Sequence, residues 1–147
     1  MKMMVNEMKV RLTAQSENEG TARSVVSVFA ASLNPTIEQL ADLRCAVSEA
    51  VTNCIVHAYR GESDRSRCYI YISVRLYDNG EISVEVADKG CGIPDIEAAR
   101  RPLFTTDPDS ERCGMGFAVM ESFTDSLKVK SKVGQGTTVL MKKSFRR

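Results

Sequence analysis

Three polar side chains recur at four-residue spacing in a segment that is otherwise rich in apolar residues. They are Glu49, Asn53 and His57, and this spacing places them in one row along a helix. A carboxylate and an amide in such a row are costly to bury without partners. In a cleft, Glu49 could accept a proton and Asn53 could bind a metal ion or a phosphate. The row could equally be the solvent-facing stripe of an amphipathic helix, and the helix alone does not separate these interpretations.

A second motif, Asp88-Lys89-Gly90-Cys91-Gly92, follows an apolar run that predicts a strand. Its two nearly adjacent glycines let the backbone approach a flat ligand closely. The Asp88 carboxylate could then accept a hydrogen bond from an exocyclic amine such as that of adenine. Because the same pattern also occurs in plain turns, it does not establish a ligand by itself.

A third motif contains Gly114 and Gly116 and is expected to open a helix. Free N–H groups exposed through glycine at a helix start favour an anion, although the same glycines could cap a helix without a ligand. The stretch between the two glycine motifs predicts a long surface loop, a lid over about residues 95–113. Arg112 at its far end could neutralise a terminal phosphate, or could be an exposed arginine with no such role.

Apolar–polar alternation indicates the strands that position these motifs. Strands are expected over 8–13, 68–77 and 81–88, the last two joined by the turn Asp78-Asn79-Gly80. A further hairpin joins 127–131 to 137–142. Antiparallel strands therefore collect in the second half of the chain.

Capping patterns indicate the helices. Ser16 with Glu19, and Thr36 with Gln39, have the spacing of a capping box, so helices are expected to begin there. The second helix continues to about Ala58, and a third covers 116–123. These elements predict one α+β domain over residues 1–147, a two-layer sandwich whose mixed, mostly antiparallel sheet carries helices on one face.

Composition excludes several classes of function. The 147 residues contain 20 Lys+Arg against 19 Asp+Glu, a formal net charge of +1, so the chain offers no broad basic field for direct nucleic-acid binding. No apolar run approaches the ~20 residues that span a bilayer, and no secretory signal is recognisable. We therefore expect a cytoplasmic protein without membrane contact. Five cysteines with no CxxC pair, and one histidine, argue against a disulfide framework or a zinc site.

The commoner nucleotide and catalytic signatures do not fit. There is no GxxxxGK[ST] phosphate loop and no GxGxxG, which excludes Walker-type and Rossmann sites. The HRD and DFG triplets of protein kinases are missing too. The single histidine lies in the helical row, so a Ser-His-Asp triad has no basis.

Taken in order, the motifs resemble the Bergerat nucleotide-binding fold of gyrase, Hsp90, histidine kinases and MutL. The matching boxes are Glu49-x-x-x-Asn53, Asp88-x-Gly90-x-Gly92, Gly114-x-Gly116 and Gly136-Thr137-Thr138. Each box is a weak match alone, but four in the correct order are strong. Longer segments resemble the anti-sigma F factor family, from residue 16 almost to the C-terminus. Those segments are 48–53, 57–59, 92–96, 102–106 and 111–117.

This resemblance implies a homodimeric serine kinase that uses ATP and Mg²⁺ and also inhibits a sigma factor. Glu49 would be the general base, Asn53 would bind Mg²⁺, and Arg112 would meet the γ-phosphate. Asp88 would recognise the adenine amine, helped by Thr138. The remaining residues expected to line the nucleotide are Gly90, Gly92, Ile93, Thr105, Thr106, Gly114, Met115, Gly116 and Phe117.

The resemblance also implies partners. They are the sporulation sigma factor F and the anti-anti-sigma factor, stage II sporulation protein AA, on which a serine is phosphorylated. Arg23 matches a position that the family uses for partner contact, although a solvated helix arginine is a credible alternative. Two other functions stay open: a stress-response anti-sigma kinase of the same switch family, and a module that holds ATP and sequesters a sigma factor without kinase activity.

Overall fold

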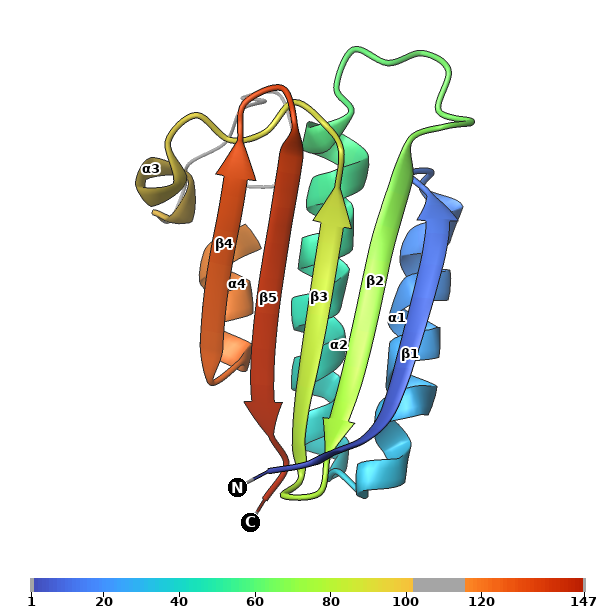
Figure 1. Cartoon of the computed structure of the whole chain (residues 1–147), viewed down its shortest axis with the longest axis vertical. Coiled ribbons are helices and arrows are strands. Elements are labelled where there is room, and N and C mark those ends of the chain that lie inside the picture. Colours follow the sequence, from blue (N-terminus) through green and yellow to red (C-terminus); the bar gives the residue numbers. More distant parts are fainter. Residues whose placement is uncertain (1, 102–115, 147) are drawn as a thin grey trace.

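The computed structural model describes residues 2–101 and 116–146. Five strands form one sheet in the order β1-β2-β3-β5-β4, and helices cover one of its faces (Figure 1). The α+β class and the one-sided helical layer are thus confirmed. We expected a mixed sheet, but each described pair of neighbouring strands is antiparallel. The strands are β1 (Met4–Thr13), β2 (Tyr69–Tyr77), β3 (Glu81–Asp88), β4 (Ser126–Lys132) and β5 (Gly136–Ser144).

The helical layer contains the following elements, given in sequence order. They are α1 (Glu17–Ala30), the 3-10 turn η1 (Ala31–Leu33), α2 (Ile37–Asn53), the π-helical turn η2 (Cys54–Ala58), α3 (Ile96–Arg100) and α4 (Gly116–Phe123). α2 lies centrally behind the sheet, flanked by α1 and α4 (Figure 1). The predicted second helix therefore does reach Ala58, but its last five residues form a π-helical turn, a feature that often marks functional sites.

The core lies between the sheet and these helices. On β2 and β3 alternate side chains point to the helices, as the periodicity predicted. The largest fully buried side chains include Ile70, Ile72, Leu76, Ile82, Leu43 and Met120. The turn between β2 and β3 has Gly80 at φ +85°, the left-handed conformation for which glycine is favoured.

One of the two predicted capping boxes is present. The Gln39 N–H donates to the Thr36 hydroxyl at 3.0 Å and the Thr36 N–H donates to the Gln39 side chain at 2.8 Å. The other helix, α1, begins where we predicted, but Ser16 makes no side-chain cap, so the predicted capping box is absent there. Glu19 instead accepts a hydrogen bond from the Ser48 hydroxyl, which ties α1 to α2.

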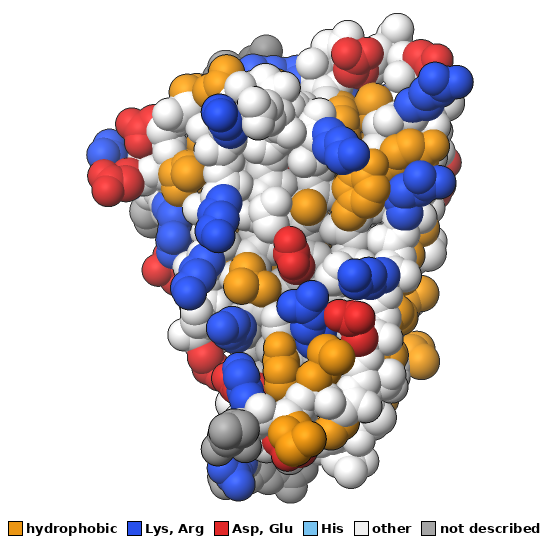
Figure 2. Space-filling model, in the orientation of Figure 1, with side chains coloured by type: hydrophobic (Ala, Val, Ile, Leu, Met, Phe, Trp, Pro, Cys, Tyr) orange, Lys and Arg blue, Asp and Glu red, His pale blue; other side chains and the backbone are white. Residues whose placement is uncertain are grey.

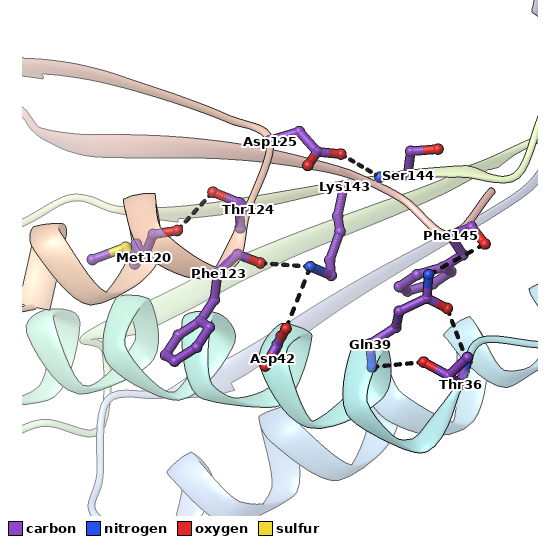
Figure 3. A network of polar contacts seen from close by, with 10 residues as sticks. All are labelled: Thr36, Gln39, Asp42, Met120, Phe123, Thr124, Asp125, Lys143, Ser144 and Phe145. Atoms are coloured by element: carbon purple, nitrogen blue, oxygen red, sulfur yellow. Dashed lines mark hydrogen bonds and ion pairs between the residues drawn. The ribbon is translucent and has the colours of Figure 1, made fainter. Parts of the chain in front are cut away.

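Polar contacts also fasten the far end of β5 to the helices (Figure 3). The Lys143 ammonium donates to the Phe123 carbonyl at the end of α4, at 2.9 Å, and lies 3.9 Å from the Asp42 carboxylate on α2. Asp125 accepts from the Ser144 N–H at 2.7 Å. A cation at a helix C-terminus is favourable because the last carbonyls lack partners within the helix.

The first part of the predicted surface loop is helical instead. The Asp95 side chain accepts from the Ala98 N–H at 3.0 Å and so caps α3. Ala99 is buried, and Arg100 lies 3.4 Å from the Glu121 carboxylate of α4. A segment with a cap and a buried side chain is a packed element, so the prediction of an irregular loop is wrong for these residues.

Among residues 2–101 and 116–146, no helix lies on the opposite face of the sheet (Figure 1), where charged side chains are interspersed with hydrophobic ones (Figure 2). Figure 2 shows this face, on which Lys and Arg side chains predominate over Asp and Glu. Lys128, Lys130 and Lys132 on β4 alternate with inward-facing residues of the same strand. Among the described residues, no helix is both long and apolar enough to cross a membrane.

Candidate functional site

A cavity of about 220 Å³ opens where the C-terminal part of the α2–η2 segment meets the end of β3. The beginnings of α4 and β5 and the segment before α3 complete its walls. Its apolar lining includes Ala50, Cys54, Ala58, Val86, Ile93, Pro94, Ala99, Phe117 and Val139. Its polar lining includes Asn53, His57, Arg60, Asp88, Asp95 and Thr137. An apolar slot with a few convergent polar groups is typical of a small-molecule site.

Two residues of the polar row lie at this cavity, whereas Glu49 lies beside the start of α4 and is not among the lining residues. Asn53 and His57 both line the cavity. A Cβ added to Gly116 would lie 3.2 Å from both terminal atoms of the Asn53 amide and 3.4 Å from Glu49 Oε2. The row is therefore packed against a neighbouring helix rather than lying along an exposed stripe. Gly116 leaves room for the two side chains on which we predicted the chemistry.

Asp88 is the most buried charged group of the site, at 9% exposure. Its Oδ1 accepts from the Gly90 N–H at 2.9 Å and from the Thr137 N–H at 3.2 Å, and its Oδ2 accepts from the Cys54 thiol at 3.5 Å. Burial raises the pKa of the Asp88 carboxyl above its ordinary value, and these three hydrogen bonds partly offset the rise. Burial also raises the pKa of the Cys54 thiol, well above its ordinary value.

The glycines after Asp88 are required by contacts within the chain. A Cβ on Gly90 would lie 2.1 Å from the Ala58 carbonyl oxygen, and one on Gly92 would lie 2.4 Å from the Lys132 carbonyl oxygen. Gly92 also has φ +78° and lines the cavity. The two glycines thus allow the loop to pack tightly against η2 and against the β4–β5 turn. We had predicted that glycine is needed there for the approach of a ligand, which is a different reason.

The structure does not bring Thr138 to the cavity. Thr138 pairs with Ala87 on the open face of the sheet, whereas Thr137 lines the cavity beside Val139. The assignment of Thr138 beside Asp88 is therefore corrected to Thr137. The alternation of β5, in which Val139 and Met141 are buried, carried the signal that would have selected Thr137.

Two supporting residues were missed entirely. The Ser131 hydroxyl accepts from the Ile93 N–H at 2.7 Å and lies 2.8 Å from the Thr137 hydroxyl, so β4 holds the loop in place. The Tyr59 hydroxyl donates to the Tyr69 carbonyl at 2.6 Å and accepts from the Lys89 N–H at 2.8 Å. Burial raises the pKa of Tyr59 to about 12, so it stays a donor. No local sequence pattern marks either residue, since both act on segments that are distant along the chain.

The remaining predicted residues fall into three groups. Ile93 and Phe117 line the cavity. Arg23 lies on α1, away from the cavity, and its Nη1 lies 3.6 Å from the Glu19 carboxylate, while its buried Nε has no hydrogen-bond partner within the described part of the chain. The others lie outside the described residues: Thr105, Thr106, Arg112, Gly114 and Met115.

The donor set at the cavity suits a hard cation that shares its ligands with a phosphate. Across residues 2–101 and 116–146, no group of three or more His, Cys, Asp or Glu side chains could hold a metal ion. The Asn53 amide oxygen can supply one ligand, and Glu49, one turn earlier on the same helix, also lies beside Gly116. Mg²⁺ is commonly bound by one or two protein oxygens together with substrate phosphates and water.

Comparisons with known proteins agree with this geometry. A family model described as a histidine kinase-like ATPase domain matches residues 12–143. An anti-sigma F factor of Clostridium perfringens (strain SM101) is 52% identical over 142 residues, which is 97% of this chain and 99% of that protein. The anti-sigma F factor of Clostridium acetobutylicum is 46% identical over 143 residues, 97% of this chain and 96% of that protein.

Solved structures share the fold. The RsbU and RsbW domains of Rv1364c from Mycobacterium tuberculosis superpose with a TM-score of 0.70 at 20% identity, over 97% of this chain and 33% of that one. A histidine kinase domain from Erythrobacter litoralis superposes with a TM-score of 0.55 at 18% identity, over 86% of this chain and 61% of that one. From the family model and the curated relatives together, this chain belongs to the histidine kinase-like ATPase domains and, among them, to the anti-sigma F factor family.

Proposed function

We propose that the cavity binds ATP, with the adenine between its apolar walls and the exocyclic amine donating to Asp88. The carboxylate is buried and ionisable, and it faces a slot lined by Val86, Ile93 and Val139. An acceptor at the end of an apolar slot suits an amino-substituted planar base. A full-length ShkA structure in complex with AMPPNP shares the fold with a TM-score of 0.55, which supports a nucleotide in this class of cavity.

We further infer that ATP is a phosphoryl donor and Glu49 the general base. Glu49 and Asn53 lie together against Gly116 at the helix start. The Glu49 carboxylate takes the proton of a serine hydroxyl, whose oxygen bonds to the γ-phosphorus as the bond to ADP breaks. Mg²⁺, when bound, neutralises charge on the phosphate oxygens, and Asn53 would hold it. Arg112, Thr105, Thr106, Gly114 and Met115 are proposed to complete the phosphate end of the site.

The names of the curated relatives, anti-sigma F factors, support a proposal for the partners. We propose that this chain inhibits sigma factor F in the cytoplasm at the onset of sporulation. Its kinase substrate would be a serine of the anti-anti-sigma factor, stage II sporulation protein AA. Arg23, outside the cavity and held by Glu19, is the proposed partner contact.

We propose that the protein acts as a homodimer. β1 is an edge strand of the sheet, and Met4 and Val5 at its beginning are more than half exposed. Beside it an apolar hollow is lined by Met8, Ser24, Val25, Val28 and Phe29. An open strand edge next to exposed apolar side chains is a surface that other chains commonly cover, which supports self-association there.

The observation that carries the kinase assignment is that Glu49 and Asn53 both lie beside Gly116, and that Asn53 and Gly116 line the cavity. The test is incubation with Mg-ATP and the anti-anti-sigma protein, followed by measurement of phosphoserine. Glu49→Ala should reduce the rate by ~10²–10⁴-fold, the usual contribution of a general base. Glu38→Ala is the matched control, since Glu38 is exposed in the first turn of the same helix. Equal rates for wild type and Glu49→Ala would remove Glu49 from the reaction. Retained ATP and sigma-factor binding with no phosphoserine from wild type would favour the module without kinase activity.

A further inference from the structure

The acceptor capacity of Asp88 is almost filled by the protein itself. An ionised carboxylate offers about four lone-pair positions on its two oxygens. Two positions on Oδ1 are taken by the N–H groups of Gly90 and Thr137, and one on Oδ2 is taken by the Cys54 thiol. One position on Oδ2 is left for a bound molecule. Any group placed there has to be a hydrogen-bond donor.

Cys54 reaches this carboxylate from the opposite layer of the fold. It is the first residue of η2, directly after Asn53, and is 3% exposed. Asp88 belongs to β3, so the S–H···O contact of 3.5 Å joins the helical layer to the sheet at the cavity wall. The two donors on Oδ1 come from the loop and from β5, which leaves Cys54 as the one described donor to Oδ2.

We propose that Cys54 is a positioning residue that determines which purine base the cavity accepts. Its thiol holds Oδ2 so that one acceptor position faces the cavity. An exocyclic amino group, as in adenine, donates to that position. A keto oxygen, as in guanine, would meet a lone pair in a poorly solvated wall, which is unfavourable. This proposal rests on the proposed binding of ATP and adds a residue that discriminates between bases.

Removal of the thiol should weaken this discrimination. In Cys54→Ala the volume of the sulfur can be filled by water, and a water hydrogen can turn toward a keto oxygen. Hydrogen bonds of this kind contribute modestly to binding, so the affinity for ATP should fall roughly threefold to tenfold. The affinity for GTP should fall less or rise, which lowers the ratio of the two affinities.

The experiment is calorimetric titration of the full chain with Mg-ATP and with Mg-GTP. The variants are Cys54→Ala and Cys54→Ser, because serine keeps a donor of similar size. Cys68→Ala is the matched control: Cys68 is also buried, at 8% exposure, but its thiol lies 3.9 Å from the Asp64 carbonyl and it does not line the cavity. We expect the affinity ratio to fall in Cys54→Ala, to be restored in Cys54→Ser and to be unchanged in Cys68→Ala.

Each result decides the proposal. An unchanged ratio in Cys54→Ala overturns it, and so does a folded Cys54→Ser variant that behaves like Cys54→Ala, since packing alone would then explain the loss. If Cys54→Ala does not fold, Cys54→Thr and Cys54→Val repeat the comparison at matched volume, and equal ratios in that pair overturn it. If wild type binds neither nucleotide, the proposed function itself fails, which is a different result from binding without discrimination by Cys54.

Discussion

The Thr137 N–H donates to the Asp88 carboxylate at 3.2 Å, which joins the beginning of β5 to the end of β3 directly at the cavity. Gly136 makes this approach possible, because a Cβ there would lie 2.1 Å from the Asp88 carbonyl oxygen. The last hairpin of the chain therefore fixes the side chain on which base recognition is proposed to depend.

ATP affinity should fall as the pH is lowered through the raised pKa of Asp88, because the protonated carboxyl loses an acceptor position. The contribution of Asp88 to the free energy of unfolding should change in the opposite direction. Its folded pKa is above its unfolded value, so the folded state binds more protons in this window and gains stability as the pH falls. Calorimetry and denaturant unfolding from about pH 7 to about pH 4.5 measure both.

Asp88→Asn is the control for this prediction. His57, Arg60 and Asp95 also line the cavity, so a variant is needed that changes Asp88 alone. The Asn variant should bind ATP weakly at neutral pH and should lack the transition assigned to Asp88. If its affinity and pH profile match those of wild type, Asp88 does not recognise the base.

Gly90→Ala should destabilise the protein by about 1–3 kcal/mol, the usual cost of forcing a side chain into filled space. The added Cβ would lie 2.1 Å from the Ala58 carbonyl oxygen, so the backbone has to move. ATP affinity should fall as well, since the Gly90 N–H holds Asp88. Denaturant unfolding and calorimetry measure the two effects.

Gly20→Ala provides the matched glycine control. Gly20 lies within α1, and a Cβ there would meet only Arg23 Nη2, at 3.9 Å. The substitution should stabilise the protein by roughly 0.5–1 kcal/mol, because alanine loses less conformational entropy in a helix. Equal effects of the two substitutions would show that the contact between Gly90 and Ala58 is not close in solution.

Lys143→Met should lower the free energy of unfolding by about 1–2 kcal/mol. The ammonium is largely buried and donates to the carbonyl at the end of α4, close to Asp42 (Figure 3). Methionine keeps the apolar stem but leaves that carbonyl without its donor. Lys142→Met, on the open face of β5, should change stability little. A similar loss in both variants would show that general charge, not the contact with Phe123, is responsible.

Local sequence determined most of the elements. The turn at Asp78–Gly80, the capping box of Thr36 and Gln39, and the helix over 116–123 all have their expected form, because each depends on residues within a few positions of one another. The four-residue spacing of Glu49 and Asn53 likewise fixed that they share a helix face. The spacing does not determine which other element packs against that face.

Tertiary contacts decided the rest. Ser16 and Glu19 have the residue types and spacing of a capping box. The Glu19 side chain nevertheless accepts a hydrogen bond from Ser48 on another helix, and the box does not form. Thr137, not Thr138, reaches the cavity because the pairing of β5 with β3 sets which side of the strand faces the helices. Gly90 is needed because its backbone packs closely against η2. Ser131 and Tyr59 form hydrogen bonds with the loop after β3, which is distant from both along the chain. A sequence specifies the local geometry and the face that each residue occupies, but a site assembled from five segments depends on which faces meet, and long-range packing alone decides that.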